Sequence, residues 1–432
     1  KTKGSCSVVK LTPYEQQMLD GKFGPFKQKA LENIVAYAEV LGATELCEVT
    51  KATVYLGAHP YLEAVKSDDY NEIFSKMLLS TDETIPMGTM AKECFCQTCV
   101  TPCDHYVYEP LHLTKELFDK NHRFLEITKE AGVSIVNSCT PYLTGWLPLM
   151  GEHYVTTESS NVLMCKGVLG ACGIWAGLEA AAWSAICGRT PLWGNHVWAN
   201  RLGTHRFVLE CPSETPLDWD VIGYTVGRKL PPHAVPILDG NFHRPDLIKL
   251  KQCFASMATT SGAEMCHIVG ITPEARTLEM ATGGKEVPTT VITRQDWEQS
   301  LKMLCDEGSG PVQFITLGCP HYTLEEIRDV ALYIKGKKVH DGVLLMIWTD
   351  IPTKESANVN GYTKMIEEAG GYLLTSGCPL VIGPKCHQGI TGMAMDGAKQ
   401  AHYIRSESDA KVYYGSKYQC VDAAVSGRWE EA

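Results

Sequence analysis

The sequence predicts an α/β protein built on parallel β-sheets. In the C-terminal third, short continuous apolar runs alternate with segments of helical pattern, and the connections between them are short. The composition, 44% hydrophobic and 21% charged, is typical of a folded globular protein. The 432 residues are enough for two or three domains.

The N-terminus is predicted to be helical. Residues 12–15 (TPYE) have the pattern of a capping box with proline at the first helical position, and this short helix is expected to end at Leu19, before Asp20-Gly21. A second helix is expected over Pro25–Leu41, where apolar residues recur at helical spacing and Gly42 follows.

The most apolar region, residues 161–188, is interrupted by Lys166 and Glu179. Its longest uninterrupted apolar run, residues 167–178, is shorter than the ~20 residues that a membrane-spanning helix needs. The same run contains four glycines. We expect closely packed, buried backbone here, as a helix or as a loop that leads into one.

The C-terminal third is predicted to alternate strands and helices. The predicted strands are residues 312–317 (VQFITL), 343–348 (VLLMIW) and 372–375 (YLLT), and the predicted helices run from a capping box at residue 323 to residue 335 and through residues 365–368. This order predicts a parallel sheet. Its ligand crevice should lie beyond the carboxyl ends of the strands.

Three cysteines follow predicted strands. Cys319 and Cys378 follow the first and third of these strands, and Cys139 follows a short predicted strand at residues 133–136. Each has a proline within the next two residues, so each thiol is expected on a constrained turn. The three thiols are candidate ligands of one metal centre. Because their separations match no short metal motif, the alternative of buried or merely neighbouring thiols remains open.

Charge and composition exclude several classes of function. The net charge of −11 and the lack of a basic run argue against general nucleic-acid binding and against a membrane-surface protein. The N-terminal residues contain no apolar stretch of signal-peptide length. The eighteen cysteines of this long chain are therefore expected to be reduced thiols in the cytoplasm, most of them buried, rather than a disulfide scaffold.

Five segments carry a resemblance to a known family. They are residues 11–24 (LTPYEQQMLDGKFG), 139–160 (CTPYLTGWLPLMGEHYVTTESS), 267–275 (HIVGITPEA), 317–327 (LGCPHYTLEEI) and 376–384 (SGCPLVIGP). In these segments, over almost its whole length, the chain resembles the large subunit of the aconitase X family. The resemblance implies a multi-lobed, aconitase-like α/β fold, with N-terminal lobes over residues 1–290 and a C-terminal α/β lobe over residues 291–432.

The resemblance also implies a chemistry, that of a hydro-lyase which removes water from a small hydroxy acid. It assigns an iron–sulfur cluster, of two-iron or four-iron type, to Cys139, Cys319 and Cys378. Three thiolates leave one iron open to act as a Lewis acid on the departing hydroxyl, while a base removes the proton. In this family a small swivelling domain supplies the catalytic serine on a Gly-Arg-Gly-Ser-type loop. Since no such loop occurs here, a separate small subunit is expected.

The substrate is open at this point. The family's characterised activities are dehydration of cis-3-hydroxy-L-proline and of mevalonate 5-phosphate. The chain has no obvious lysine and arginine cluster for a phosphate, which favours cis-3-hydroxy-L-proline or a similar carboxylate over mevalonate 5-phosphate. A non-catalytic, cluster-binding paralogue that acts as a redox or iron sensor is the alternative from another class. It is motivated by Cys165-Lys166 and residues 172–174, which replace Asn-Ser and Arg-Thr-Asn of the family pattern.

The resemblance also selects candidate substrate-binding residues, namely Glu158, Ser159, Ser160, His196, Arg201, Lys166 and Lys399. Glu158 is expected to accept a hydrogen bond from a substrate ammonium or hydroxyl, and the structural alternative is a helix N-terminus. Arg201 is the candidate for the substrate carboxylate, against a structural ion pair, and Lys166 is the candidate replacement for the lost arginine. His321 is expected to donate a hydrogen bond to cluster sulfur or to be a structural histidine.

A cysteine-rich loop is a second candidate metal site. Cys94, Cys96, Cys99 and Cys103 lie within ten residues, with His105 close by. This density of thiols suits a zinc ion or a second cluster. A third hypothesis for the function is therefore an enzyme whose metal is a zinc ion at this loop. The alternative is a redox-inert loop that partly lines the active site.

Overall fold

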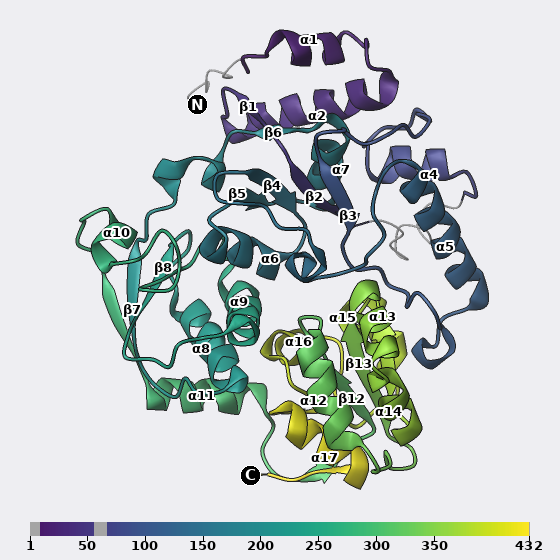
Figure 1. The fold of residues 1–432 in the computed structure, drawn as a ribbon, viewed down its shortest axis with the longest axis vertical. Coiled ribbons are helices and arrows are strands. Elements are labelled where there is room, and N and C mark those ends of the chain that lie inside the picture. The colour runs from purple at the N-terminus through teal and green to yellow at the C-terminus, as the bar shows by residue number, and fades with distance from the viewer. Residues whose placement is uncertain (1–8, 56–66, 432) are drawn as a thin grey trace.

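A computed structural model describes residues 9–55 and 67–431, and its described residues form three parallel sheets (Figure 1). The strand orders are β3-β2-β4-β5, β10-β7-β8-β9 and β14-β13-β12-β15-β16. In Figure 1 the first sheet lies in the upper half, the second at the left and the third at the lower right. The prediction of an α/β fold with parallel sheets is therefore confirmed.

The first sheet follows the two predicted N-terminal helices. The Thr12 capping box opens α1, and Gly42, in the left-handed conformation, ends α2 as predicted. Helices α2 and α7 pack together over a core that includes Ile34 and Ala181. The elements are α1 (Pro13–Leu19), α2 (Pro25–Leu41), β1 (Leu46–Glu48), β2 (Lys51–Val54), α4 (Tyr70–Met77), β3 (Phe95–Thr98), η1 (Glu109–Leu111), α5 (Lys115–Glu130), η2 (Pro141–Thr144), β4 (His153–Thr156), α6 (Ser159–Leu163), η3 (Met164–Val168), β5 (Cys172–Trp175), α7 (Leu178–Cys187) and β6 (Arg189–Pro191).

The second sheet packs against helices α8 and α9. These two helices approach closely at Gly223, where a Cβ would lie 2.0 Å from the carbonyl oxygen of Cys253. The expected lobe boundary at residues 290/291 falls inside β10, and this two-lobe division stays a prediction. The elements are η4 (Gly194–His196), η5 (Trp198–Asn200), β7 (His205–Glu210), α8 (Pro216–Lys229), β8 (Pro236–Gly240), α9 (Leu247–Ser261), β9 (His267–Ile268), α10 (Leu278–Thr282), β10 (Thr289–Thr293) and α11 (Arg294–Leu304).

The third sheet contains the three predicted C-terminal strands. From β12 the chain adds β13 and β14 on one side, then crosses to add β15 and β16 on the other side of β12. The gap between the ends of β12 and β15 is thus the point at which ligands bind in such sheets. The elements are β11 (Gly310–Pro311), β12 (Phe314–Leu317), α12 (Leu324–Ile334), β13 (Leu344–Thr349), α13 (Ile351–Val359), α14 (Tyr362–Ala369), β14 (Tyr372–Thr375), α15 (Pro379–Ile382), η6 (Pro384–His387), β15 (Gly392–Met395), α16 (Ala398–Ile404), β16 (Lys411–Tyr414), α17 (Lys417–Ser426) and β17 (Arg428–Trp429).

Two local predictions were wrong. Residues 133–136 form no strand, only a single bridge between Ser134 and Gln97. The β-ladder stops there because the side-chain hydroxyl of Thr98, and not a backbone carbonyl, accepts the next hydrogen bonds. Its Oγ1 accepts hydrogen bonds from the backbone N–H groups of Val136 (3.1 Å) and Asn137 (3.0 Å).

The apolar run at residues 167–178, expected to be a helix or a loop, contains strand β5. Gly173 lets β5 lie against the ring of Tyr154, from which a Cβ at this position would be only 2.4 Å away. Among the described helices, none combines the length and the apolar character needed to cross a bilayer.

Candidate active site

A cavity of about 400 Å³ lies where the carboxyl ends of the first and third sheets meet. From the first sheet, residues just after β2, β3 and β4 and the last residue of β5 line it. From the third sheet, residues just after β12, β14 and β15 line it. The principal polar lining residues are Cys139, Glu158, Ser159, Ser160, Cys319, His321, Cys378 and Lys399. The two sheets thus place the candidate ligands and several candidate substrate residues in one cavity.

The turns that carry Cys139, Cys319 and Cys378 share a backbone feature. Each has a residue with positive φ one or two positions before the cysteine, namely Asn137 (+52°), Gly318 (+95°) and Ser376 (+73°). At Asn137 and Ser376 this conformation costs of the order of 1–3 kcal/mol per residue, whereas a glycine such as Gly318 adopts it readily. A hydrogen bond of 3.1 Å from Asn137 Nδ2 to Ser376 Oγ holds two of the turns together. Such strain at the turns of Cys139 and Cys378 is typical of a functional site.

His321 connects the three turns. It lies two residues after Cys319, and its backbone N–H donates to Cys139 Sγ at 3.2 Å. Its ring Nε2 lies 2.8 Å from the carbonyl oxygen of Gly377, the residue before Cys378. Burial lowers the pKa of His321, so the ring is neutral, and because a carbonyl only accepts, Nε2 carries the proton. The backbone of His321 therefore makes the expected bond to sulfur, and its ring has a structural role.

The three thiols suit a site that receives a cation. Burial raises the pKa of Cys139 and of Cys378 to about 12 and that of Cys319 well above its ordinary value, while Lys399 opposes this for each. A bound metal reverses the preference, because a coordinating thiol is deprotonated. The three sulfurs are not among the described groups whose ligand atoms all lie within 4.8 Å of one another. This wider spacing suits a cluster, in which each thiolate binds a different iron.

Glu158, Lys399 and Glu407 are the acidic and basic residues among the described cavity lining. Glu158 is the N-cap residue of α6, but its side chain makes no capping hydrogen bond, so the structural alternative for this carboxylate is not realised. Burial raises the pKa of Glu158, although Lys399 and His321 oppose the shift. Burial alone would lower the pKa of Lys399, but attraction to Glu158, Cys319 and Cys139 outweighs burial and raises it. Glu158 and Lys399 therefore face the same space and attract each other.

Lys166, His196 and Arg201 lie elsewhere and, in the described part of the chain, do not line this cavity. Lys166 is fully buried, with Nζ 2.8 Å from Asn195 Oδ1 and 3.2 Å from Glu264 Oε2. Arg201 is also buried and pairs with Glu274 through two nitrogens. These three residues belong to a second polar cluster around β5. Their assignment to substrate binding stays a prediction without geometric support.

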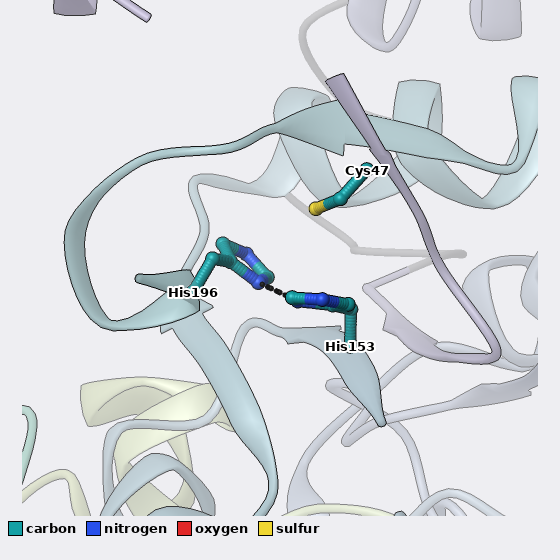
Figure 2. A group of neighbouring side chains, drawn as sticks. All are labelled: Cys47, His153 and His196. Atoms are coloured by element: carbon teal, nitrogen blue, oxygen red, sulfur yellow. Dashed lines mark hydrogen bonds between the residues drawn. The ribbon is translucent and has the colours of Figure 1, made fainter. Parts of the chain in front are cut away.

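The cysteine-rich loop does not gather its thiols at one point. Cys94 and Cys96 pack into the core beneath the first sheet, and Cys103 packs into the core beside the third. Cys99 lies at the edge of the cavity and accepts a 3.2 Å hydrogen bond from Thr157 Oγ1. In residues 9–55 and 67–431, the one close group of three such ligands is Cys47, His153 and His196 (Figure 2).

Two aspartates that the sequence did not single out support the site. Asp104 Oδ2 accepts a 2.9 Å hydrogen bond from Thr375 Oγ1, which ties the cysteine-rich loop to the end of β14. Asp220, on α8, accepts hydrogen bonds through Oδ2 from the Ala398 N–H (2.7 Å) and the Tyr414 hydroxyl (2.8 Å), and so fixes the start of the helix that carries Lys399. The one feature of the sequence that could have identified Asp220 is the presence of an acidic residue within an apolar helical segment.

Comparison with known proteins gives concordant matches. The family models described as Aconitase X first, second and third domain match residues 8–199, 203–302 and 312–426. The phosphomevalonate dehydratase large subunit of Methanothermobacter thermautotrophicus is 30% identical over 404 residues, which cover 92% of this chain and 95% of that protein. The cis-3-hydroxy-L-proline dehydratase of Hypocrea jecorina is 26% identical over 431 residues, which cover 98% of this chain and 70% of that protein. The crystal structure of Thermococcus kodakaraensis aconitase X in its holo-form superposes with a TM-score of 0.81 at 25% identity, covering 96% and 100% of the two chains.

Proposed function

This chain belongs to the aconitase X family, and on that premise we propose that it is the large subunit of an iron–sulfur-dependent dehydratase for cis-3-hydroxy-L-proline or a closely similar hydroxy amino acid. That it is a hydro-lyase follows from the family and from its dehydratase relatives. The observation that carries the proposal is the one cavity in which the thiols of Cys139, Cys319 and Cys378 face the Glu158–Lys399 pair.

Cys139, Cys319 and Cys378 would hold the cluster. When bound, the cluster supplies a Lewis acid for the departing hydroxyl. The His321 N–H would stabilise the thiolate of Cys139, and the N–H groups of Leu380 and Val381, which lower the pKa of Cys378 against the effect of burial, would stabilise its thiolate. Lys399 adds positive charge beside all three sulfurs. The family chemistry and this donor set therefore support the same assignment.

The charges of the cavity favour an amino acid substrate. A cyclic hydroxy amino acid has one carboxylate and one ammonium, which Lys399 and Glu158 would bind respectively. Ser159 and Ser160 would donate hydrogen bonds to the substrate. Among the described lining residues, Lys399 is the one lysine or arginine, which is a poor complement for a molecule with both a phosphate and a carboxylate. Mevalonate 5-phosphate remains the second candidate, because a relative of nearly equal length is a phosphomevalonate dehydratase large subunit.

We infer that a separate small subunit completes the site with the serine that removes the proton. The relatives whose names contain "large subunit" include proteins matched over 95% or more of their length. The Hypocrea jecorina dehydratase carries no subunit designation, and 70% of its length lies within the match. The rest of that protein is long enough to contain a fused domain equivalent to the small subunit. A cytoplasmic location is part of the same proposal.

A substrate panel tests the proposal. The chain, co-purified anaerobically with its small subunit, is assayed with cis-3-hydroxy-L-proline, its trans isomer and mevalonate 5-phosphate. We expect the highest kcat/KM for cis-3-hydroxy-L-proline and a raised KM for that substrate in Lys399→Met. Turnover of the phosphorylated compound alone would contradict the proposed substrate and leave the hydro-lyase assignment intact.

A further inference from the structure

A group of three side chains outside the cavity has the composition of a metal site. Cys47 on β1, His153 at the start of β4 and His196 at the end of η4 each offer one ligand atom, and these atoms all lie within 4.8 Å of one another. Figure 2 shows the three side chains converging from three separate segments. We propose that Cys47, His153 and His196 bind a Zn²⁺ ion at a site separate from the catalytic cavity.

The two imidazoles already share a position that suits a cation. Their Nδ1 atoms lie 3.0 Å apart (Figure 2). Two neutral rings can face each other in this way only if one nitrogen carries the proton and the other accepts it. The two nitrogens therefore face one shared region, and a metal ion that displaces the proton can bind both of them there. Imidazole nitrogen and thiolate sulfur are the ligands that zinc prefers in proteins.

Little else holds the ring of His196 or the thiol of Cys47. His196 is 2% exposed, and its Nε2 has no hydrogen-bond partner among the described residues. No hydrogen bond from that nitrogen therefore opposes a rotation of the ring toward an ion. The Cys47 thiol donates a single weak hydrogen bond, of 3.7 Å, to the carbonyl oxygen of Thr190. Both groups can turn to a metal at small cost.

A fourth ligand and an entry route are both available. The β4–β5 register pairs His153 with Cys172, so these side chains lie side by side on one face of the sheet. Cys172, or a water molecule, would complete a tetrahedral shell. Cys47 and His153 are both half-buried, so the group is accessible from solvent.

This site lies at the opposite end of the sheet from the cavity. His153 and Cys172 begin β4 and β5, whereas the cavity is lined by residues at and beyond the other end of these strands. Three residues at about 3.3 Å each separate the two ends, or about 10 Å. An ion here would not contact substrate. It would fasten the short β1–β6 ribbon and η4 to the first sheet and stabilise the fold according to its affinity.

The test must keep zinc from the cluster thiols. A background variant with Cys139→Ser, Cys319→Ser and Cys378→Ser is purified as the full chain, analysed for zinc, and titrated with Co²⁺ as a coloured substitute. We expect one ion per chain, with the thiolate-to-cobalt charge-transfer absorption and the d–d bands of a tetrahedral site. Adding Cys47→Ser should abolish the charge-transfer absorption if water is the fourth ligand and reduce it if Cys172 is. Adding His196→Gln should weaken zinc binding by at least about 100-fold, since loss of an outer-shell partner alone costs up to that much.

Cys211→Ser is the matched control, because Cys211 is also a partly exposed free thiol but follows β7 in the second sheet. This variant should bind Co²⁺ like the background protein. Absence of stoichiometric binding in the background variant, or a charge-transfer absorption that Cys47→Ser leaves unchanged, would overturn the proposal. If Cys47→Ser fails to fold, His153→Gln and His196→Gln give the same test through zinc affinity and the zinc-dependent rise in Tm. The result does not depend on the catalytic proposal, which is tested separately by analysis of the iron and sulfide content.

Discussion

The backbone N–H of His321 donates a hydrogen bond to Sγ of Cys139 at 3.2 Å, although the two residues lie 182 positions apart in the sequence. The His321 ring bonds in turn to the carbonyl oxygen of Gly377, beside Cys378. Since His321 also lies two residues after Cys319 on the same turn, one residue contacts or carries all three cysteine turns. The spacing of the three thiols therefore depends on contacts between segments of the first and third sheets.

Removal of the His321 ring should weaken this arrangement without removing the N–H bond to sulfur. In His321→Ala the buried Gly377 carbonyl loses its partner, which should lower the free energy of unfolding by about 1–3 kcal/mol and reduce the iron content. His321→Gln, whose side-chain amide can donate to the same carbonyl, should retain more of both. Denaturant unfolding and iron analysis check the prediction, and equal behaviour of the two variants would contradict it.

Gly318→Ala should disrupt the Cys319 turn. Gly318 has a φ of +95°, and a Cβ there would lie 2.3 Å from the carbonyl oxygen of Trp348. Gly361→Ala is the control, because Gly361 also has a positive φ (+75°) but no heavy atom of the described residues lies within 4 Å of the added Cβ. The control should cost roughly 1–2 kcal/mol for backbone strain alone. Gly318→Ala should cost more and should also lose iron, whereas an equal loss of Tm with iron retained would contradict this account.

The pH profile should report on Glu158. Burial raises its pKa above the ordinary 4.5, so the carboxylate that binds a substrate ammonium forms only at higher pH than for an exposed glutamate. We expect kcat/KM to rise with pH on an acid limb above pH 4.5. Glu158→Gln should remove that limb together with most of the activity. Glu179→Gln, at the start of α7 and not among the described lining residues, should keep the limb.

Asp220 should make stability depend on pH. Burial raises its pKa from 3.8 to about 7. Because the folded state binds this proton more tightly than the unfolded state, the contribution of Asp220 is fully present below pH 3.8 and is lost as the pH rises through about 7. Relative to Asp220→Asn, the wild-type protein should lose free energy of unfolding over that interval. Denaturant titrations of both proteins at several pH values measure the difference, and parallel curves would contradict the assignment.

The sequence predicted those features that depend on local residues. The capping boxes at Thr12 and Thr323 and the strand at 372–375 are set by adjacent side chains, and the structure has all three. The convergence of Cys319 and Cys378 followed from one rule about parallel sheets, and both line the cavity.

Features that depend on distant partners could not be predicted in this way. Lys166 and Arg201 have the chemistry of anion-binding groups. In the structure both are buried and form ion pairs with Glu264 and Glu274, which lie far along the chain. The strand β5 lies within a glycine-containing apolar run whose periodicity does not separate a strand from a helix. The positive φ of Asn137 and Ser376 could not be predicted, because neither residue is a glycine. A hydrogen bond between their two side chains, which lie far apart in the sequence, accompanies this conformation.

The central claim, an iron–sulfur cluster on Cys139, Cys319 and Cys378, is tested most directly by metal and sulfide analysis of the anaerobically purified protein. The wild-type chain with its small subunit should contain iron and sulfide together. Each single change of these cysteines to serine should lower both by at least about tenfold. Cys305→Ser, a change at a partly exposed thiol outside the described cavity lining, should leave them unchanged. A wild-type protein without sulfide, or iron that survives all three substitutions, would contradict the account.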